Sequence, residues 1–187
     1  LTEADAIAIK TSIQNVSDLC PSSNKSFPVR YKGISLGGVL TMGVTPNFTD
    51  IRNFRPSEGR FFSWDENNEA LKVVVLGSKV AEKLFGDESP LGKTVLLYRV
   101  PCKVVGVMET KGVDLSGIDQ DNQILMPFKT FQRRFVNKNY MNAICVRVDV
   151  KESIQRAKNE IQGLLNVRHK PKDGKDDFSV VDIRDLN

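Results

Sequence analysis

The sequence is poor in the residues that build most metal and catalytic centres. It has one histidine, His169, and three cysteines, which stand far apart as Cys20, Cys102 and Cys145. A single histidine excludes most zinc sites that depend on histidine, and scattered cysteines supply neither a CxxC ligand pair nor a disulfide framework. One disulfide is compatible with an oxidising compartment, but the sequence does not say which pair would form it. We therefore expect no catalytic, cofactor-binding or metal-ligating residue and no enzyme.

The sequence also lacks the run of roughly 20 apolar residues that a membrane-spanning helix needs. Its longest apolar run with a buried character is 73–76, which fits a strand. No basic segment followed by an apolar one stands at the start, where the chain opens on a helix cap, Thr2. We therefore expect a domain cut from a longer chain.

Charge of one sign is not concentrated anywhere. The net charge of +4 is spread along a chain that is 40% hydrophobic and 27% charged, as in ordinary globular proteins. The densest basic cluster, 168–172, is interrupted by Pro171 and has no aromatic residues to stack on bases. This pattern predicts a solvated loop and no nucleic-acid partner.

Two segments resemble ligand-binding loops without meeting their requirements. Residues 86–94 contain Gly86 followed by Gly92-Lys93-Thr94, but the stretch between the two glycines is one residue too long for a P-loop, and the segment follows a helix instead of a strand. Asp114, Asp119 and Asp121 lack the glycine and glutamate of an EF-hand. A turn and a solvated acidic loop are the expected structures.

Hydrophobic spacing predicts an α+β fold. Helical spacing covers the ranges 2–19, 48–54, 78–85, 129–135 and 152–167. Thr2 and Asp5 form a capping-box pattern at the start of the first range, and Cys20 is expected in the loop that follows it. Ser78 is the expected cap of the third range and Gly86 its end, and the last range carries an apolar stripe of Ile154, Ala157, Ile161, Leu164 and Leu165. Alternation and short apolar runs predict strands at 27–31, 39–44, 72–77, 94–98, 102–109, 123–126, 142–150 and 178–183. Polar segments that would carry partner-binding residues as loops are 21–26, 64–69, 111–122 and 170–176.

Short motifs of glycine, proline and apolar residues follow one another along nearly the whole chain. Their residues are Gly43, Pro46, Gly59, Arg60, Phe61, Phe62, Gly77, Leu84, Phe85, Gly86, Gly92, Lys93, Gly106, Asp121, Pro127, Arg168, His169 and Phe178. In this order they resemble the motifs of the periplasmic domain of MacB/FtsX-type ABC-transporter permeases. Cys102 stands where that family usually has phenylalanine or tyrosine. Because most of these residues are glycine, proline or apolar, they report a fold and not a catalytic site.

The resemblance implies a porter-like α/β subdomain built from residues 1–57 and 138–187, with a β-rich, sabre-like insertion at 58–137. It implies flanking transmembrane helices of the same full-length chain, a permease homodimer or heterodimer, and a location on the extracytoplasmic side of the bacterial inner membrane. ATP would be bound by a separate cytoplasmic ATPase domain or subunit, and no cofactor by this domain.

The expected function is to couple ATP hydrolysis to efflux or extrusion, in contact with a periplasmic adaptor (membrane fusion protein) or a lipoprotein carrier. One alternative is a sensory or regulatory domain that detects peptides or controls cell-wall hydrolases without transport. A free-standing secreted binding protein is a further alternative.

Overall fold

An α+β fold, as the sequence predicted, is present in the computed structural model, which describes residues 1–137, 141–169 and 178–182. The strands are β1 (Val16–Tyr31), β2 (Ile34–Val44), β3 (Pro56–Gly59), β4 (Val73–Leu76), β5 (Thr94–Leu97), β6 (Val100–Met108), β7 (Gln123–Pro127) and β8 (Ala143–Val148). The α-helices are α1 (Glu3–Ser12), α2 (Phe48–Ile51), α3 (Trp64–Asn68), α4 (Ser78–Phe85), α5 (Phe128–Thr130) and α6 (Ile154–His169). A π-helical segment, η1 (Phe131–Val136), continues α5, and a 3-10 turn, η2 (Lys151–Ser153), leads into α6. No helix in the described part of the chain combines the length and the apolar content that crossing a membrane requires.

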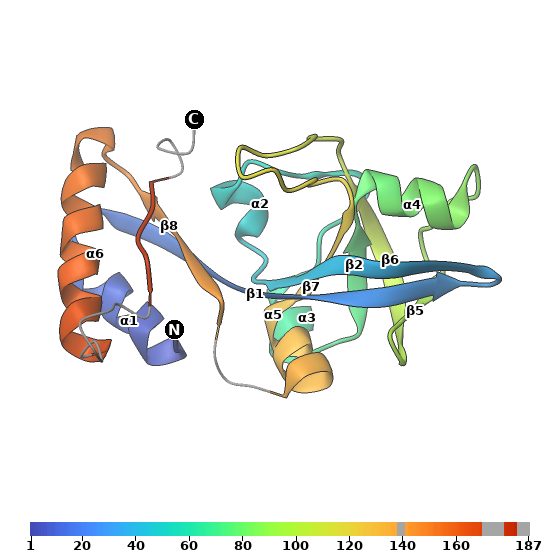
Figure 1. Cartoon of the computed structure of the whole chain (residues 1–187), viewed down its shortest axis with the longest axis horizontal. Coiled ribbons are helices and arrows are strands. Elements are labelled where there is room, and N and C mark those ends of the chain that lie inside the picture. The colour runs from blue at the N-terminus through green and yellow to red at the C-terminus, as the bar shows by residue number, and fades with distance from the viewer. Residues whose placement is uncertain (138–140, 170–177, 183–187) are drawn as a thin grey trace.

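The strand β1 organises the sheet because it pairs with β2, β5 and β8. From β2 the sheet continues through β7, β4, β6 and β5 and returns to β1, so these strands close into a ring. The β2–β7 and β4–β6 pairs are parallel, and the others are antiparallel. β8 lies outside the ring, paired with β1 (Figure 1). β3 also lies outside it, paired with β6. Closure satisfies backbone groups that an open sheet would leave at its edges.

Two clusters of buried apolar side chains occupy the two faces of the ring strands. The first receives side chains from every ring strand and from α4, and the second lies under α2 and residues 61–62. β4 serves both clusters, with Val74 and Leu76 in the first and Val73 and Val75 in the second. A strand buried on both faces explains why this segment is apolar throughout.

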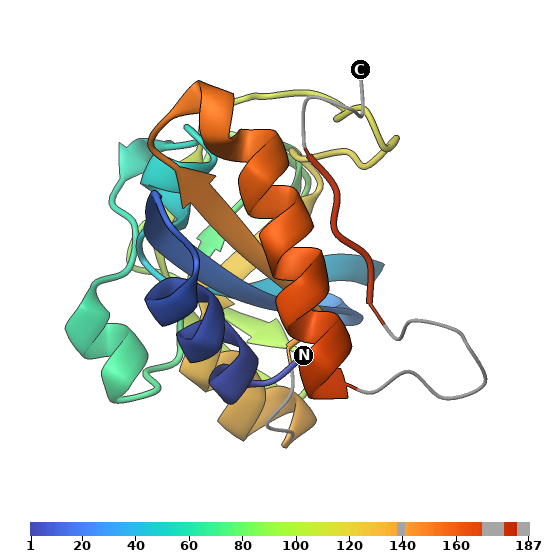
Figure 2. The ribbon, with the colours of Figure 1, turned by 90° about the vertical axis from the view of Figure 1, so that its left-hand side faces the viewer.

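A third cluster lies beneath α1 and α6, which Figures 1 and 2 show side by side against β8 and the first part of β1. Its fully buried members are Ile9, Ile13, Ala157, Ile161 and Leu165. The stripe predicted for the last helix is therefore confirmed at Ala157, Ile161 and Leu165, as is the alternation in β8, whose Ile144, Val146 and Val148 pack here. The layer of α1 and α6 joins the rest of the molecule through β1 and β8.

The helix predicted over residues 2–19 is wrong in its second half. Asn15 has a positive φ of 63°, and the chain is extended from Val16, where β1 begins. Val16 and Leu19 reach the third cluster from this strand. The strand is favoured because its backbone groups pair with β8, and the same strand continues through residues 21–26, which were predicted to form a loop.

Several smaller expectations also fail. Residues 64–69, predicted to be a polar loop, contain α3, because Ser63 and Glu66 form a capping box in which each side chain accepts a hydrogen bond from the other's amide. Ser78 was predicted to cap α4, but the N-cap residue is Gly77, which has no side chain to form a capping hydrogen bond. Pro101 lies inside β6 instead of between two strands. Residues 178–182 are not assigned to a strand, and the predicted loop at 170–176 lies outside the described residues.

The division into a porter-like part (1–57 and 138–187) and a sabre-like insertion (58–137) stays a prediction. β2 pairs with β7 and β1 pairs with β5 across these boundaries. The two predicted parts therefore share one sheet in the described residues.

Candidate functional site

A buried ion-pair cluster joins the start of α1 to the end of α6. Asp5 Oδ1 lies 2.8 Å from Arg168 Nε, and Asp5 Oδ2 lies 2.9 Å from His169 Nε2. The Asp5 side chain is 4% exposed, whereas that of Arg168 is 35% exposed. A carboxylate so nearly removed from water needs charged or hydrogen-bonding partners, and both come from a helix that lies at the other end of the sequence.

The local sequence explains how Asp5 is held. The Thr2 hydroxyl accepts a hydrogen bond from the Asp5 amide at 3.3 Å, and Asp5 Oδ2 accepts one from the Thr2 amide at 3.0 Å. This capping box was predicted from the sequence. The carboxylate stands in the first turn of α1 and the basic pair in the last turn of α6, where each charge is favoured by its own helix dipole.

The electrostatics of Asp5 follow from these contacts. Burial alone would raise its pKa, but the hydrogen bonds from Arg168, His169 and Thr2 outweigh burial and lower the pKa to about 2. The Phe178 ring packs edge-on against the His169 imidazole, with centroids 5.4 Å apart. Arg168 and His169 therefore hold α6 against α1.

A second candidate surface is the β6–β7 loop (residues 109–122). At its tip Val113, Leu115 and Ile118 are 62%, 59% and 46% exposed. Asp114 Oδ1 builds the tip by accepting hydrogen bonds from the amides of Ser116 and Ile118, each at 2.9 Å. The tip is thus a defined turn that presents apolar side chains to solvent, as binding loops do.

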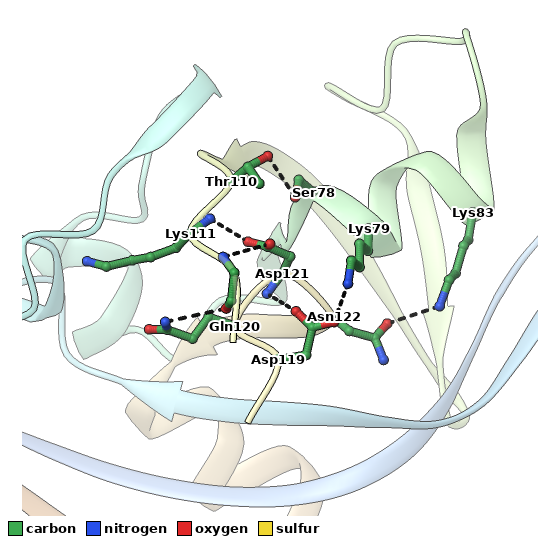
Figure 3. Close-up of polar contacts among 10 residues, drawn as sticks. Ser78, Lys79, Lys83, Thr110, Lys111, Asp119, Gln120, Asp121 and Asn122 are labelled. Carbon is green, nitrogen blue, oxygen red and sulfur yellow. Dashed lines mark hydrogen bonds and ion pairs between the residues drawn. The ribbon is translucent and has the colours of Figure 1, made fainter. Parts of the chain in front are cut away.

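The base of the β6–β7 loop is fixed to the body by two aspartates (Figure 3). Asp121 accepts hydrogen bonds from the amides of Lys111 at 2.7 Å and Gly112 at 2.9 Å. Asp119 Oδ2 lies 2.5 Å from Lys79 Nζ on α4. The prediction of a solvated acidic loop is therefore wrong for Asp121, which is 2% exposed, because its carboxylate closes the loop at its base.

The start of α1 and the β6–β7 loop lie apart in the molecule. In Figures 1 and 2 the N-terminus is in the lower half of the view and the loop is at the top.

Comparison with known proteins identifies the domain. The family model of the MacB-like periplasmic core domain matches residues 1–164. The chain belongs to this family. It is 33% identical over 184 residues to the macrolide export ATP-binding/permease protein MacB of Bdellovibrio bacteriovorus, a match that covers 97% of this chain and 28% of the relative. The corresponding protein of Chlorobium luteolum is 36% identical over 144 residues, 77% of this chain and 22% of its own length.

Solved structures agree with this assignment. The extracellular domain of the noncanonic ABC-type transporter YknZ from Gram-positive bacteria has a TM-score of 0.81 at 25% identity, covering 97% of this chain and 89% of that one. The periplasmic region of MacB from Actinobacillus actinomycetemcomitans shares the fold, with a TM-score of 0.80 at 22% identity and 92% and 76% coverage. This chain is a periplasmic domain of the MacB-like permease type, and it spans less than a third of the curated relatives above.

In this MacB-like domain most of the predicted motif glycines lie at close approaches of the chain. A Cβ at Gly43, Gly59, Gly77 or Gly106 would come within 2.4, 2.3, 2.3 and 2.1 Å of neighbouring atoms. At Gly77 the neighbour is the carbonyl oxygen of Asp121, so these two motif residues meet at the base of the β6–β7 loop. Gly86 and Gly92 have open surroundings and instead adopt positive φ.

The other motif residues are divided between packing and turns. Arg60 pairs with Glu66 at 2.6 Å, and Phe61 and Phe62 belong to the second cluster, where Phe61 stacks on Phe48. Leu84 and Phe85 are buried on α4, Pro46 lies in the turn before α2, and Pro127 ends β7. Lys93, which lies 3.7 Å from Glu88, stands in a turn that follows α4 and precedes β5, the order predicted for the segment that resembles a P-loop.

Sequence reasoning missed three features of the site. The contact from Asp5 to Arg168 joins residues 163 positions apart and left no local signal. The apolar tip did leave one, because Val113, Leu115 and Ile118 interrupt a segment otherwise made of polar residues and glycine. The third feature is Cys20, which was expected in a loop but is buried in β1 opposite Cys145.

Proposed function

We propose that this domain is the extracytoplasmic moving part of an ABC-type exporter. ATP hydrolysis on a separate cytoplasmic ATPase would move the membrane helices, and the domain would pass that motion to substrate or partner outside the membrane. The observation on which the proposal depends is the Asp5–Arg168–His169 cluster, because it couples the first helix of the domain to the last. The names of the relatives, macrolide export proteins, support the proposal of a role in export.

The path of motion follows from the packing. A membrane helix placed before Leu1 would pull on α1, whose buried face contacts α6 through the third cluster. Separating the two helices would expose the Asp5 carboxylate and break its ion pair with Arg168, so the layer moves as a unit. β1 and β8 then transmit the displacement to the ring.

We further propose that a periplasmic adaptor protein docks on the tip of the β6–β7 loop. Three exposed apolar side chains on one hydrogen-bonded turn are the kind of anchor that protein partners bury.

The coupling proposal is tested in the full-length transporter with Asp5→Asn, and with Glu3→Gln as a control that removes an exposed carboxylate from the same helical turn. We expect Asp5→Asn to retain basal ATP hydrolysis and to lose about tenfold in export, while Glu3→Gln changes neither. Equal export by both variants, at equal amounts of protein in the membrane, would refute a coupling role for the cluster.

The sensory alternative predicts a different result in the same cells. Deletion of the whole gene would then leave efflux of the substrate unchanged and would abolish a transcriptional or hydrolase response to the peptide. Measuring efflux and response in parallel distinguishes the two functions.

A further inference from the structure

Cys20 and Cys145 face each other across the β1–β8 ladder. They are direct Cα partners in an antiparallel register, next to the pair of Leu19 with Val146. Opposite Cα atoms in such a ladder are about 4.5–5.5 Å apart, and disulfides join Cα atoms about 4.4–6.8 Å apart. The backbone therefore meets the distance requirement for a disulfide without moving.

The two side chains also point to the same face of the sheet. Both pack on the second cluster, Cys20 as a member that is 1% exposed and Cys145 as a partly buried neighbour. The adjacent residues Leu19, Ile144 and Val146 point the other way, into the third cluster. Two thiols on one face of directly opposed residues are brought together by the fold itself.

The remaining cysteine is not positioned for this reaction. Cys102 lies on β6 opposite Val95, and its buried side chain belongs to the first cluster, on the other face of the ring strands. Among the described residues, Cys145 is thus the cysteine that the register places beside Cys20.

We propose that Cys20 and Cys145 form a disulfide in the mature protein, introduced outside the membrane by a disulfide-bearing oxidoreductase. Domains of this family face the periplasm or the exterior, where disulfides form and persist. The inference rests on that location and on the register, and it is independent of the proposed coupling role.

The reaction is a thiol–disulfide exchange in two steps. The thiolate of Cys145, the more exposed of the two, attacks a sulfur of the oxidant's disulfide and releases one oxidant thiol. The Cys20 thiolate then attacks Cys145 Sγ and displaces the second. One Sγ–Sγ bond replaces two S–H bonds, and the two protons and two electrons end on the oxidant, which becomes a dithiol.

The structure also indicates when the exchange takes place. Burial raises the pKa of Cys20 to about 11, and burial raises the pKa of Cys145 as well, so few thiolates exist once the domain has folded. In the reduced form the Thr45 hydroxyl donates a hydrogen bond to Cys20 Sγ at 3.4 Å, and this contact also holds the thiol in the closed cluster. The exchange is therefore fastest during folding, before the second cluster closes.

The disulfide would strengthen the junction between the two parts of the molecule. β8 is attached to the sheet through β1 alone in the described residues, and this ladder links the layer of α1 and α6 to the ring. A covalent bond between β1 and β8 would keep the layer of α1 and α6 attached to the ring when force is applied to it.

The test uses the full-length protein, isolated from its native membrane in the presence of an alkylating agent that blocks free thiols. After denaturation and proteolysis without reductant, mass spectrometry should find the peptides of Cys20 and Cys145 linked and two hydrogens lighter, with Cys102 alkylated. Recovery of Cys20 and Cys145 as alkylated thiols, or a bond from either to Cys102, overturns the proposal.

A stability measurement gives an independent readout. Reductant should lower the melting temperature of this domain by about 5–10 °C, because the disulfide restricts the unfolded chain and its loss removes that stabilisation. In Cys145→Ala this dependence on reductant should disappear, whereas the matched Cys102→Ala should retain it. A wild-type melting temperature that is the same with and without reductant would contradict the disulfide.

Discussion

Arg168 Nε lies 2.8 Å from Asp5 Oδ1, and together with the His169–Asp5 contact this pair ties the last turn of α6 to the first turn of α1. The geometry is asymmetric, because the carboxylate is 4% exposed and the Arg168 side chain is 35% exposed. Removal of the guanidinium would leave the buried Asp5 carboxylate without this partner, whereas removal of the carboxylate would leave a cation that can turn toward water. The cluster is therefore best tested by changing Asp5.

Asp5→Asn should lower the free energy of unfolding by about 2 kcal/mol, because the amide keeps the size of the side chain and loses its attraction to the basic pair. Denaturant unfolding of the domain measures this change. The control, Glu3→Gln, removes a charge from the same turn at an exposed position and should stay within about 0.5 kcal/mol of wild type. Equal losses in both variants would mean that the helix dipole matters and the ion pair does not.

The same carboxylate predicts a loss of stability in acid. Its pKa falls from 3.8 to about 2 on folding, so the unfolded state binds more protons between these values. The contribution of Asp5 is fully present above about pH 5 and is lost as the pH drops through 4 toward 2. The difference in unfolding free energy between wild type and Asp5→Asn should shrink over that window. A difference independent of pH would assign the effect of the substitution to packing.

The parts of the fold that local patterns determine could be predicted from the sequence. The apolar stripe at Ile161 and Leu165, the alternation at Ile144 and Val146, and the double-sided burial of 73–76 each follow from a period or a run. Gly86 also ends α4 as expected, because its positive φ closes the helix.

The predictions fail where contacts between distant parts of the chain determine the local structure. Residues 16–19 have helical spacing, but pairing with β8, more than a hundred residues later, draws them into β1. The same pairing turned an expected loop around Cys20 into a strand in which Cys20 itself is buried. The sequence predicted only a capping role for Asp5, because no residue near it in the sequence indicates a contact with Arg168.

The apolar tip of the β6–β7 loop should act in binding and not in folding. Leu115→Asp replaces a side chain that is 59% exposed, so the melting temperature should change by less than about 2 °C. Affinity for the periplasmic adaptor, measured by titration of the full-length transporter, should fall at least about tenfold. The exposed Leu91→Asp, on a different turn, serves as the control and should bind normally. Normal binding by Leu115→Asp would remove the tip from the interface.

The base of that loop should behave in the opposite way. Asp121→Ala leaves the amides of Lys111 and Gly112 without their acceptor, which costs about 1–3 kcal/mol or opens the loop locally. Hydrogen exchange at these two amides should accelerate strongly. Asp87→Ala, at an exposed position, should leave both rates unchanged. Slow exchange retained in Asp121→Ala would show that the loop is closed by other contacts.

Two glycines of the same chain should respond to alanine with opposite signs. A Cβ at Gly106 would lie 2.1 Å from the carbonyl oxygen of Arg60, so Gly106→Ala must push residues 59–60 away from β6 and should cost about 1–3 kcal/mol. Gly163 lies within α6, and a Cβ added there would meet no atom within 4 Å apart from its own stretch of helix. Gly163→Ala should therefore stabilise the domain by up to about 1 kcal/mol. Melting curves of the two variants test the pair together. A neutral Gly106→Ala would mean that this motif glycine is required for something other than the close approach of the two chain segments.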